Sequence, residues 1–133
     1  MFKLSKKTEY GLLALQYMLM HSRQVATVRE IAEYHNISKT LLAKILQGLV
    51  KSDIVESVQG AQGGYSIKRD AGKISIAAVM EAIEGPVHIT DCYYNDSCCD
   101  RYDVCSLKDR FVPLQNGIIQ QLNNVSLAEF LKE

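Results

Sequence analysis

The sequence predicts a mainly α-helical fold with one small β-hairpin and a long C-terminal helix. Three observations predict it. Apolar residues recur at three- and four-residue steps through the first 50 residues, two short alternating stretches flank a glycine-rich turn, and an apolar stripe runs from Leu107 to Leu122. The chain has 133 residues, of which 47% are hydrophobic, as in ordinary folded proteins, so disorder is not expected.

Three short helices are expected at the N-terminus. Ser5 can cap the first, and Thr27 and Glu30 have the spacing of a capping box that begins the second, which should end near His35. Ser38 can cap the third, whose apolar residues share one face. The apolar positions assigned to the first helix are Leu4, Tyr10, Leu13, Ala14, Tyr17, Met18 and Leu19.

A hairpin follows the third helix. Residues 54–58 and 65–68 alternate like strands, and the turn Gly60–Gly64 between them is rich in glycine, which permits positive φ and a close backbone approach to a ligand. The second and third helices have the spacing of a helix-turn-helix, and the added hairpin gives the element order of a winged helix-turn-helix. The sequence therefore indicates a DNA-binding protein, with a purely structural hairpin as the alternative.

Three further helices are expected after the hairpin. Ser75 can cap a helix that Gly85 and Pro86 end, and Ser126 can begin a last short one. Between them lies the long stripe, in which Pro113 predicts either a kink or a helix that begins near it. Its apolar residues are Leu107, Phe111, Leu114, Ile118, Ile119 and Leu122. This stripe predicts a homodimer through the C-terminal helix, although packing on the chain's own first helix would also bury it.

Charge divides the chain near residue 73. Residues 1–73 hold 11 Lys and Arg against 6 Asp and Glu, a net charge of +5, while residues 74–133 hold 4 against 9, a net charge of −5. We therefore expect a winged-helix DNA-binding domain in residues 1–73 and a cysteine-loop sensor and dimerisation region in residues 74–133. No signal peptide or membrane span is recognised, so a cytoplasmic protein that binds a double-stranded DNA operator is expected.

Candidate DNA contacts lie on the third helix and at the hairpin tip. Their hydroxyl, amide and amine groups can reach phosphates or base edges, and the tip glycines can add backbone contacts. An ordinary solvated helix face is the alternative interpretation. The candidates are Ser38, Lys39, Thr40, Lys44, Gln47, Gln59, Gln62, Gly63 and Tyr65, with Lys44 as the first choice.

All four cysteines fall in residues 92–105, which we call the cysteine loop: Cys92, Cys98, Cys99 and Cys105. Such clustering argues against a disulfide framework, which would spread its cysteines along the chain. Several thiolates on one loop can converge on a soft metal centre. Zinc is the second choice because the loop lacks a C-x2-C pair, and a thiol-disulfide switch or cysteines without a function remain alternatives. An enzyme is not expected, since the chain has no C-x-x-C, no Ser-His-Asp pattern and no phosphate loop.

The element order, the segments GAQGGYSI, VMEAIEGP and VSLAEFL, and the cysteine loop together resemble the Rrf2 family of bacterial winged-helix regulators over essentially the whole chain. That family includes the iron-sulfur cluster regulator IscR and the nitric-oxide-sensing repressor NsrR. The resemblance implies a homodimer and an iron-sulfur cluster, with 2Fe-2S preferred over 4Fe-4S, held by ligands at Cys92, Cys98 and Cys105.

Two departures from the family pattern concern the fourth ligand and the DNA contacts. The histidine that IscR-like members place after the third cysteine is missing, since the chain reads Ser106-Leu107-Lys108. Glu9 resembles the acidic ligand that NsrR-like members supply from the first helix of the partner subunit, and Cys99 is its rival. Gln59 and Ala43 replace an arginine and an acidic residue, so a different operator preference is expected.

Overall fold

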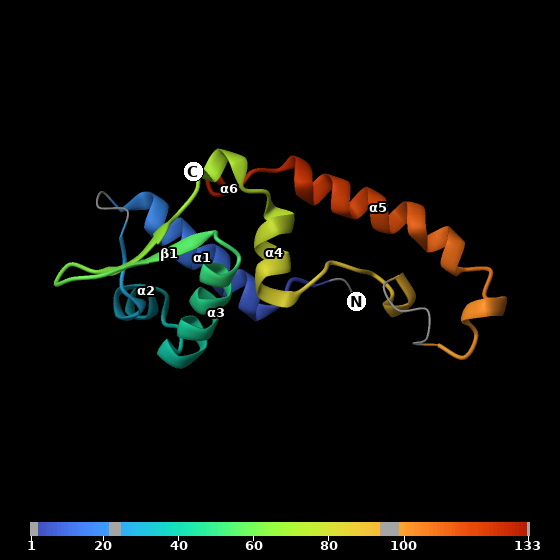
Figure 1. The fold of residues 1–133 in the computed structure, drawn as a ribbon, viewed down its shortest axis with the longest axis horizontal. Helices are drawn as coiled ribbons and strands as arrows, with labels where there is room; N and C mark the ends of the chain where they lie inside the picture. Colours follow the sequence, from blue (N-terminus) through green and yellow to red (C-terminus); the bar gives the residue numbers. More distant parts are fainter. Residues whose placement is uncertain (1–2, 22–24, 94–98, 133) are drawn as a thin grey trace.

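The computed structural model describes residues 3–21, 25–93 and 99–132, and it confirms the expected mainly helical fold with a two-stranded antiparallel hairpin (Figure 1). Three 3-10 turns, η1 (Ala71–Lys73), η2 (Asp91–Tyr93) and η3 (Tyr102–Val104), lie in the connections. The helices and strands are α1 (Lys6–Met20), α2 (Val28–His35), α3 (Lys39–Lys51), β1 (Val55–Val58), β2 (Gly64–Ile67), α4 (Ile76–Glu84), α5 (Lys108–Asn124) and α6 (Leu127–Phe130).

Side-chain caps begin the helices where the sequence predicts them. The Ser5 hydroxyl accepts a hydrogen bond from the Thr8 N–H at 3.1 Å. Thr27 and Glu30 form the complete capping box: the Thr27 hydroxyl accepts from the Glu30 N–H at 3.1 Å, and the Glu30 carboxylate accepts from the Thr27 N–H at 2.8 Å. Asn36 ends α2 in the left-handed conformation, with φ 54°. The predicted caps of α3, α4 and α6 are formed in the same way by Ser38, Ser75 and Ser126.

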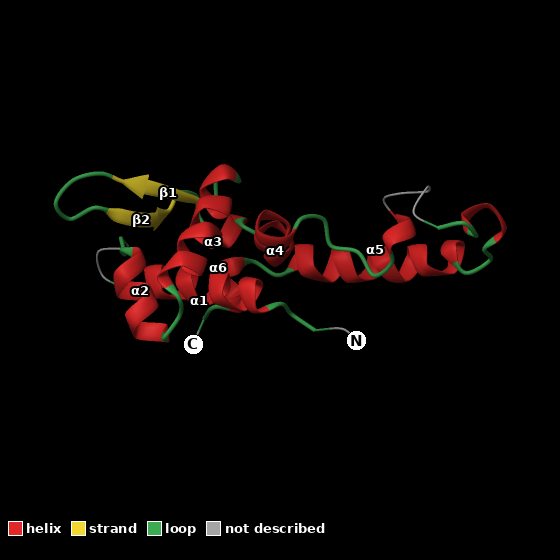
Figure 2. Ribbon diagram, turned by 90° about the horizontal axis from the view of Figure 1, so that it is seen from below, coloured by secondary structure: helices red, strands yellow, loops and turns green. Residues whose placement is uncertain are grey.

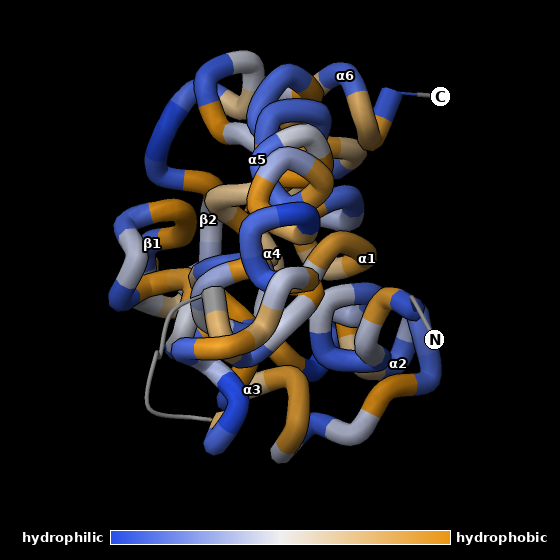
Figure 3. Tube along the Cα trace, turned by 90° about the vertical axis from the view of Figure 1, so that its right-hand side faces the viewer, coloured by the Kyte–Doolittle hydropathy of each residue, from blue (hydrophilic) through white to orange (hydrophobic). Residues whose placement is uncertain are grey.

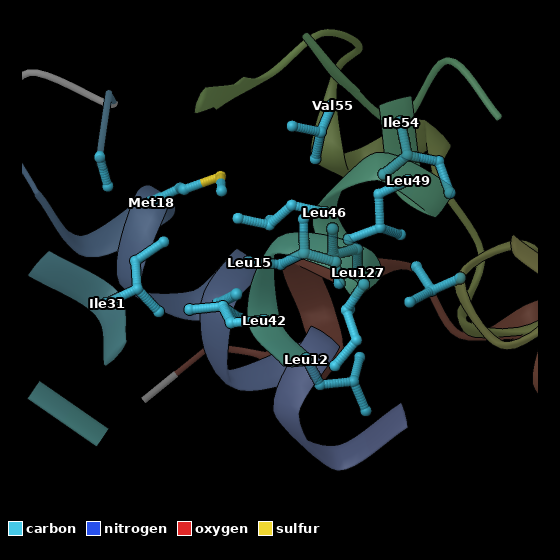
Figure 4. Packing of buried hydrophobic residues seen from close by; sticks show 14 of the residues in the cluster. Leu12, Leu15, Met18, Ile31, Leu42, Leu46, Leu49, Ile54, Val55 and Leu127 are labelled. Carbon is cyan, nitrogen blue, oxygen red and sulfur yellow. The ribbon is translucent and has the colours of Figure 1, made fainter. Parts of the chain in front are cut away.

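The hydrophobic core joins α1 and α3 to α4 and α6 (Figure 4). The face expected for the first helix was partly wrong: Leu12 and Leu15 are buried, whereas Leu13 and Leu19 are only partly buried and Leu4 is 44% exposed. Helix α1 carries apolar residues nearly all round, so periodicity alone could not identify its buried side. Further fully buried side chains are Met18, Leu42, Leu46, Leu49, Val79 and Leu127.

The hairpin is fixed to the start of α2. Strand β1 pairs with β2 in antiparallel register, and Ala26 and Tyr65 exchange two backbone hydrogen bonds, of 2.9 and 2.7 Å. Gly64 has φ +152°, and a Cβ there would lie 2.5 Å from the Ala26 carbonyl oxygen. A glycine is therefore required where the hairpin meets the helix-turn-helix.

Helix α5 returns the chain from the cysteine loop to the core. The Leu127 N–H donates to the Ile74 carbonyl at 2.7 Å, and the Ile76 N–H donates to the Val125 carbonyl at 3.0 Å, so the C-terminal segment pairs with the segment before α4. The hairpin and the described parts of the cysteine loop, η2 and η3, lie at opposite ends of the long axis (Figures 1 and 2).

Helix α5 contains Pro113 but begins five residues before it, at Lys108, so of the two alternatives the helix that begins near the proline was wrong, and the kink stays a prediction. Pro113 is the sixth residue of α5 and has no N–H to donate to the Asp109 carbonyl, so the helix continues through it without that hydrogen bond. Regions 1–73 and 74–133 both contribute to one core, and their division stays a prediction. In the described part of the chain, no helix combines the length and the apolar character needed to cross a membrane.

Candidate DNA interface and cysteine site

The polar face of α3 is exposed. Buried leucine and isoleucine residues hold the opposite face on the core, which fixes the direction in which the polar face points. The Ser38 hydroxyl is already used, because it accepts a hydrogen bond from the Leu41 N–H at 3.4 Å. The predicted contacts that lie exposed here are Ser38, Lys39, Thr40, Lys44 and Gln47.

The predicted hairpin contacts divide into two groups. Gln59 and Gln62 are exposed at the tip, where they can reach a ligand. Gly63 and Tyr65 are partly buried, the Tyr65 side chain packs against the core, and its backbone pairs with Ala26. Tyr65 therefore has a structural role at the hairpin base, and a contact from its side chain to DNA stays a prediction.

Ion pairs occupy some, but not all, of the basic residues in this region. Lys68 donates to the Asp53 carboxylate at 3.0 Å, and this hydrogen bond and its charge hold the pKa of Asp53 below its usual range. Arg29 pairs with Glu33 at 2.9 Å. Lys44 on α3 makes no ion pair with another described residue, so its charge faces solvent. An exposed, uncompensated lysine on a recognition-type helix can neutralise a DNA phosphate.

At the other end of the molecule, the three described cysteines are free thiols. Cys92 lies in η2, partly buried, and its thiol donates to the Thr90 hydroxyl at 3.3 Å; Cys105 follows η3, also partly buried, and Cys99 is exposed. A cavity of about 130 Å³ adjoins Cys92 and the start of α5. Its lining is Thr90, Cys92, Tyr102, Lys108, Asp109, Phe111 and Val112.

The predicted ligands are not assembled in the described residues. Among residues 3–21, 25–93 and 99–132, no three His, Cys, Asp or Glu side chains gather closely enough to hold a metal ion. Cys98 lies outside the described residues. Glu9, near the start of α1, has a 45% exposed side chain that accepts a hydrogen bond from Lys6 at 2.8 Å, so it can be reached from solvent.

Sequence reasoning missed the residues that hold the two ends of the cysteine loop on α5. Gln115 is 1% exposed; its Oε1 accepts from the Ile89 N–H at 2.6 Å, and its Nε2 donates to the Val87 carbonyl at 2.5 Å. The Lys108 ammonium donates to the Tyr102 carbonyl at 2.6 Å. Gln115 follows Phe111 by four residues, so a polar residue in line with the apolar stripe was the available signal.

Another side of α5 is apolar and open. A shallow groove of about 490 Å³ runs along it, and Leu114 in this groove is 59% exposed. Figure 3 shows hydrophobic as well as hydrophilic positions on this helix. The groove is lined by Pro113, Leu114, Gly117, Ile118, Gln121 and Leu122. Three of its residues, Leu114, Ile118 and Leu122, belong to the stripe that the sequence assigns to dimerisation.

A family model described as "Rrf2: Iron-dependent Transcriptional regulator" matches residues 4–133. The protein rrf2 of Nitratidesulfovibrio vulgaris is 29% identical over 132 residues, which cover 98% of this chain and 88% of the relative. The HTH-type transcriptional regulator IscR of Sodalis glossinidius is 32% identical over 130 residues, 97% of this chain and 78% of the relative.

Two solved structures are similar along nearly the whole chain. IscR from T. potens has a TM-score of 0.75 at 26% identity, covering 98% of this chain and 87% of that one. CymR, the global cysteine regulator of B. subtilis, has a TM-score of 0.73 at 21% identity, covering 98% of this chain and 97% of that one, which shows the same fold.

Proposed function

The chain belongs to the Rrf2 family of transcriptional regulators, and from that premise we propose that it is a homodimer whose affinity for a DNA operator depends on an iron-sulfur cluster at the cysteine loop. Its relatives are regulators and not enzymes. The observation that carries the proposal is the position of the free Cys92 thiol beside a cavity at one end of α5, while the other end joins the core that holds α3.

Helix α3 and the hairpin form the proposed DNA interface. The exposed amine of Lys44 and amide of Gln47 reach base edges or phosphates in the major groove. The tip, with Gln59 and Gln62, contacts phosphates or the minor groove alongside. The third helix also supplies Ser38, Lys39 and Thr40, and the hairpin supplies Gly63 and Tyr65.

A second copy of the chain is proposed to cover the apolar groove of α5. The groove leaves Leu114 more than half exposed, which is costly for a surface without a partner. Two-fold pairing would present two α3 helices to two operator half-sites.

The donor chemistry of the loop fits an iron-sulfur centre, because thiolates are its usual ligands. Cys92, Cys98 and Cys105 are the proposed ligands, with the partner subunit's Glu9 as fourth ligand and Cys99 as its rival. When bound, the cluster would supply a redox-active centre whose loss or modification changes operator affinity. The 2Fe-2S form is preferred over the 4Fe-4S form.

The fourth ligand is tested by substituting Glu9 and its rival separately. Glu9→Gln removes the carboxylate but keeps the size of the side chain. Glu33→Gln is the matched control, because Glu33 is an exposed glutamate on α2. We expect Glu9→Gln to shift the visible absorbance of the reconstituted protein and shorten cluster lifetime, with Glu33→Gln and Cys99→Ser unchanged. A spectral change in Cys99→Ser, with none in Glu9→Gln, assigns the ligand to Cys99.

Anaerobic purification followed by iron, sulfide and zinc analysis tests the cofactor itself. We expect iron and acid-labile sulfide in equal amounts, together with visible absorbance from sulfide-to-iron charge transfer. Zinc without iron contradicts the cluster and supports the zinc-bound regulator.

A cluster-free regulator that uses its cysteines as a thiol redox switch is the second candidate. It is favoured by the absence of three assembled ligands within the described residues and by the exposure of Cys99. Metal analysis after the same purification distinguishes the two candidates, since this regulator contains no metal. Its operator affinity should instead change on mild oxidation and reduction.

A further inference from the structure

Helix α5 carries two side chains that fasten the backbone on both sides of the cysteine loop. Gln115 holds residues 87–89, which lead into the loop, and Lys108 holds Tyr102, near its end. Both anchors are side-chain contacts to backbone groups, so they act on the path of the chain whatever side chains the loop carries.

The Gln115 contact has the geometry of a short piece of strand pairing. Its side-chain amide satisfies the peptide groups on both sides of His88, through the Val87 carbonyl and the Ile89 N–H. Gln115 is 1% exposed, so water cannot replace either bond without opening the packing. A buried amide with both partners matched resists sliding of the segment in either direction.

The Lys108 contact holds the end of the loop. Its ammonium donates to the Tyr102 carbonyl at 2.6 Å and lies 4.0 Å from the centre of the Tyr102 ring. The cation therefore has two partners on one residue, and η3 is fixed against the first turn of α5.

Each anchor lies the same distance along the chain before a thiol. Ile89 precedes Cys92 by three residues and Tyr102 precedes Cys105 by three, so each cysteine is within about 10 Å of chain from a fastened backbone group. Lys108 and Gln115 are themselves seven residues apart, two helical turns, and hence lie on one face of α5. The cavity beside Cys92 lies along the same face.

We propose that Gln115 and Lys108 are positioning residues that hold Cys92 and Cys105 on one face of α5 before any metal centre is bound. Fastening both sides of the loop lowers the conformational entropy lost when the thiols converge. The proposal deepens the proposed function and rests on it only for the lifetime of the cluster; the position of the thiols in the cluster-free protein is independent of it.

The test uses Gln115→Met and Lys108→Met, which keep the length of each side chain but remove its polar contacts. Gln120→Met is the matched control, because Gln120 is exposed on the same helix. In cluster-free dimer, amide exchange at Ile89 and the rate of alkylation of Cys92 by iodoacetamide are measured, with exposed Cys99 as the internal reference. In reconstituted protein, loss of visible absorbance to a chelator is followed.

We expect Gln115→Met to abolish the protection of the Ile89 amide and to accelerate alkylation of Cys92. Lys108→Met should accelerate alkylation of Cys105. Both variants should lose the cluster about tenfold faster than wild type and Gln120→Met. Unchanged amide exchange and alkylation overturn the proposal, as does a variant that melts at a lower temperature yet keeps wild-type alkylation and cluster lifetime.

Failure of the proposed function has a different signature. If wild-type protein takes up no iron or sulfide, the cluster is refuted, while Ile89 exchange and Cys92 alkylation still decide whether Gln115 positions the loop.

Discussion

Leu127→Ala tests whether α6 anchors the C-terminal end of α5 in the core that also holds α1 and α3. Leu127 is fully buried, and its N–H donates to the Ile74 carbonyl at 2.7 Å, so α6 fixes the end of α5 to the segment before α4. Truncating a buried leucine to alanine costs about 2–5 kcal/mol of unfolding free energy, because apolar contacts are lost and a cavity remains. We expect about 3 kcal/mol here, or a fall in Tm of roughly 10 °C for a chain of this size.

Thermal unfolding followed by circular dichroism measures this loss, at one protein concentration because the proposed dimerisation would add to the apparent stability. Phe130→Ala is the control: Phe130 lies in the same helix but is 52% exposed, so its truncation should cost less than about 1 kcal/mol. Equal, small losses for Leu127→Ala and Phe130→Ala would refute the docking of α6 on the core.

Three further predictions concern the hairpin, a partly buried histidine and the DNA interface. Gly64→Ala should lower stability by about 1–3 kcal/mol and weaken operator binding, since its Cβ meets the Ala26 carbonyl. Gly60→Ala shares the strain of a positive φ, 108°, but has open space around it, so it should cost less in thermal melts. Burial lowers the pKa of His35 below its ordinary value of 6.5, against an opposing hydrogen bond with the Leu13 backbone. The neutral form is therefore favoured in the folded state, and the stability it contributes is present above pH 6.5 and is lost as the pH falls below it. His35→Phe should show a smaller fall in Tm between about pH 7.5 and about pH 5.5, and an equal fall would contradict this origin. Lys44→Ala should weaken operator binding and reduce the slope of log affinity against log salt by about 0.9, whereas an unchanged slope in a titration by fluorescence anisotropy would exclude a phosphate contact.

The helix starts could be predicted from sequence because the signal is local. The capping box of Thr27 and Glu30 needs only residues three apart, and both of its hydrogen bonds are present. The buried side of α1 could not be predicted, since Leu12 and Leu13 are equally apolar and only packing against α3 and α4 distinguishes them. Which residues of α1 are buried depends on tertiary contacts, and the local sequence pattern does not indicate these.

In the candidate site, too, the sequence predicted what depends on local periodicity and missed what depends on distant partners. The exposed position of Lys44 followed from the apolar period of its own helix. The roles of Gln115 and Tyr65 depend on partners 26 and 39 residues away in the chain, at Ile89 and Ala26. Pairings between distant backbone segments leave no periodic signal, which is why a polar residue in line with an apolar stripe was passed over.

The most direct test of the proposed cluster control is operator affinity measured on one preparation of the protein, first with the cluster bound and then after its removal under anaerobic conditions. Fluorescence anisotropy at a fixed salt concentration keeps the electrostatic part of binding equal in the two states. Cluster control predicts a change of about 5- to 150-fold, equivalent to about 1–3 kcal/mol of coupling between the two sites. Equal affinities for the two forms would contradict it.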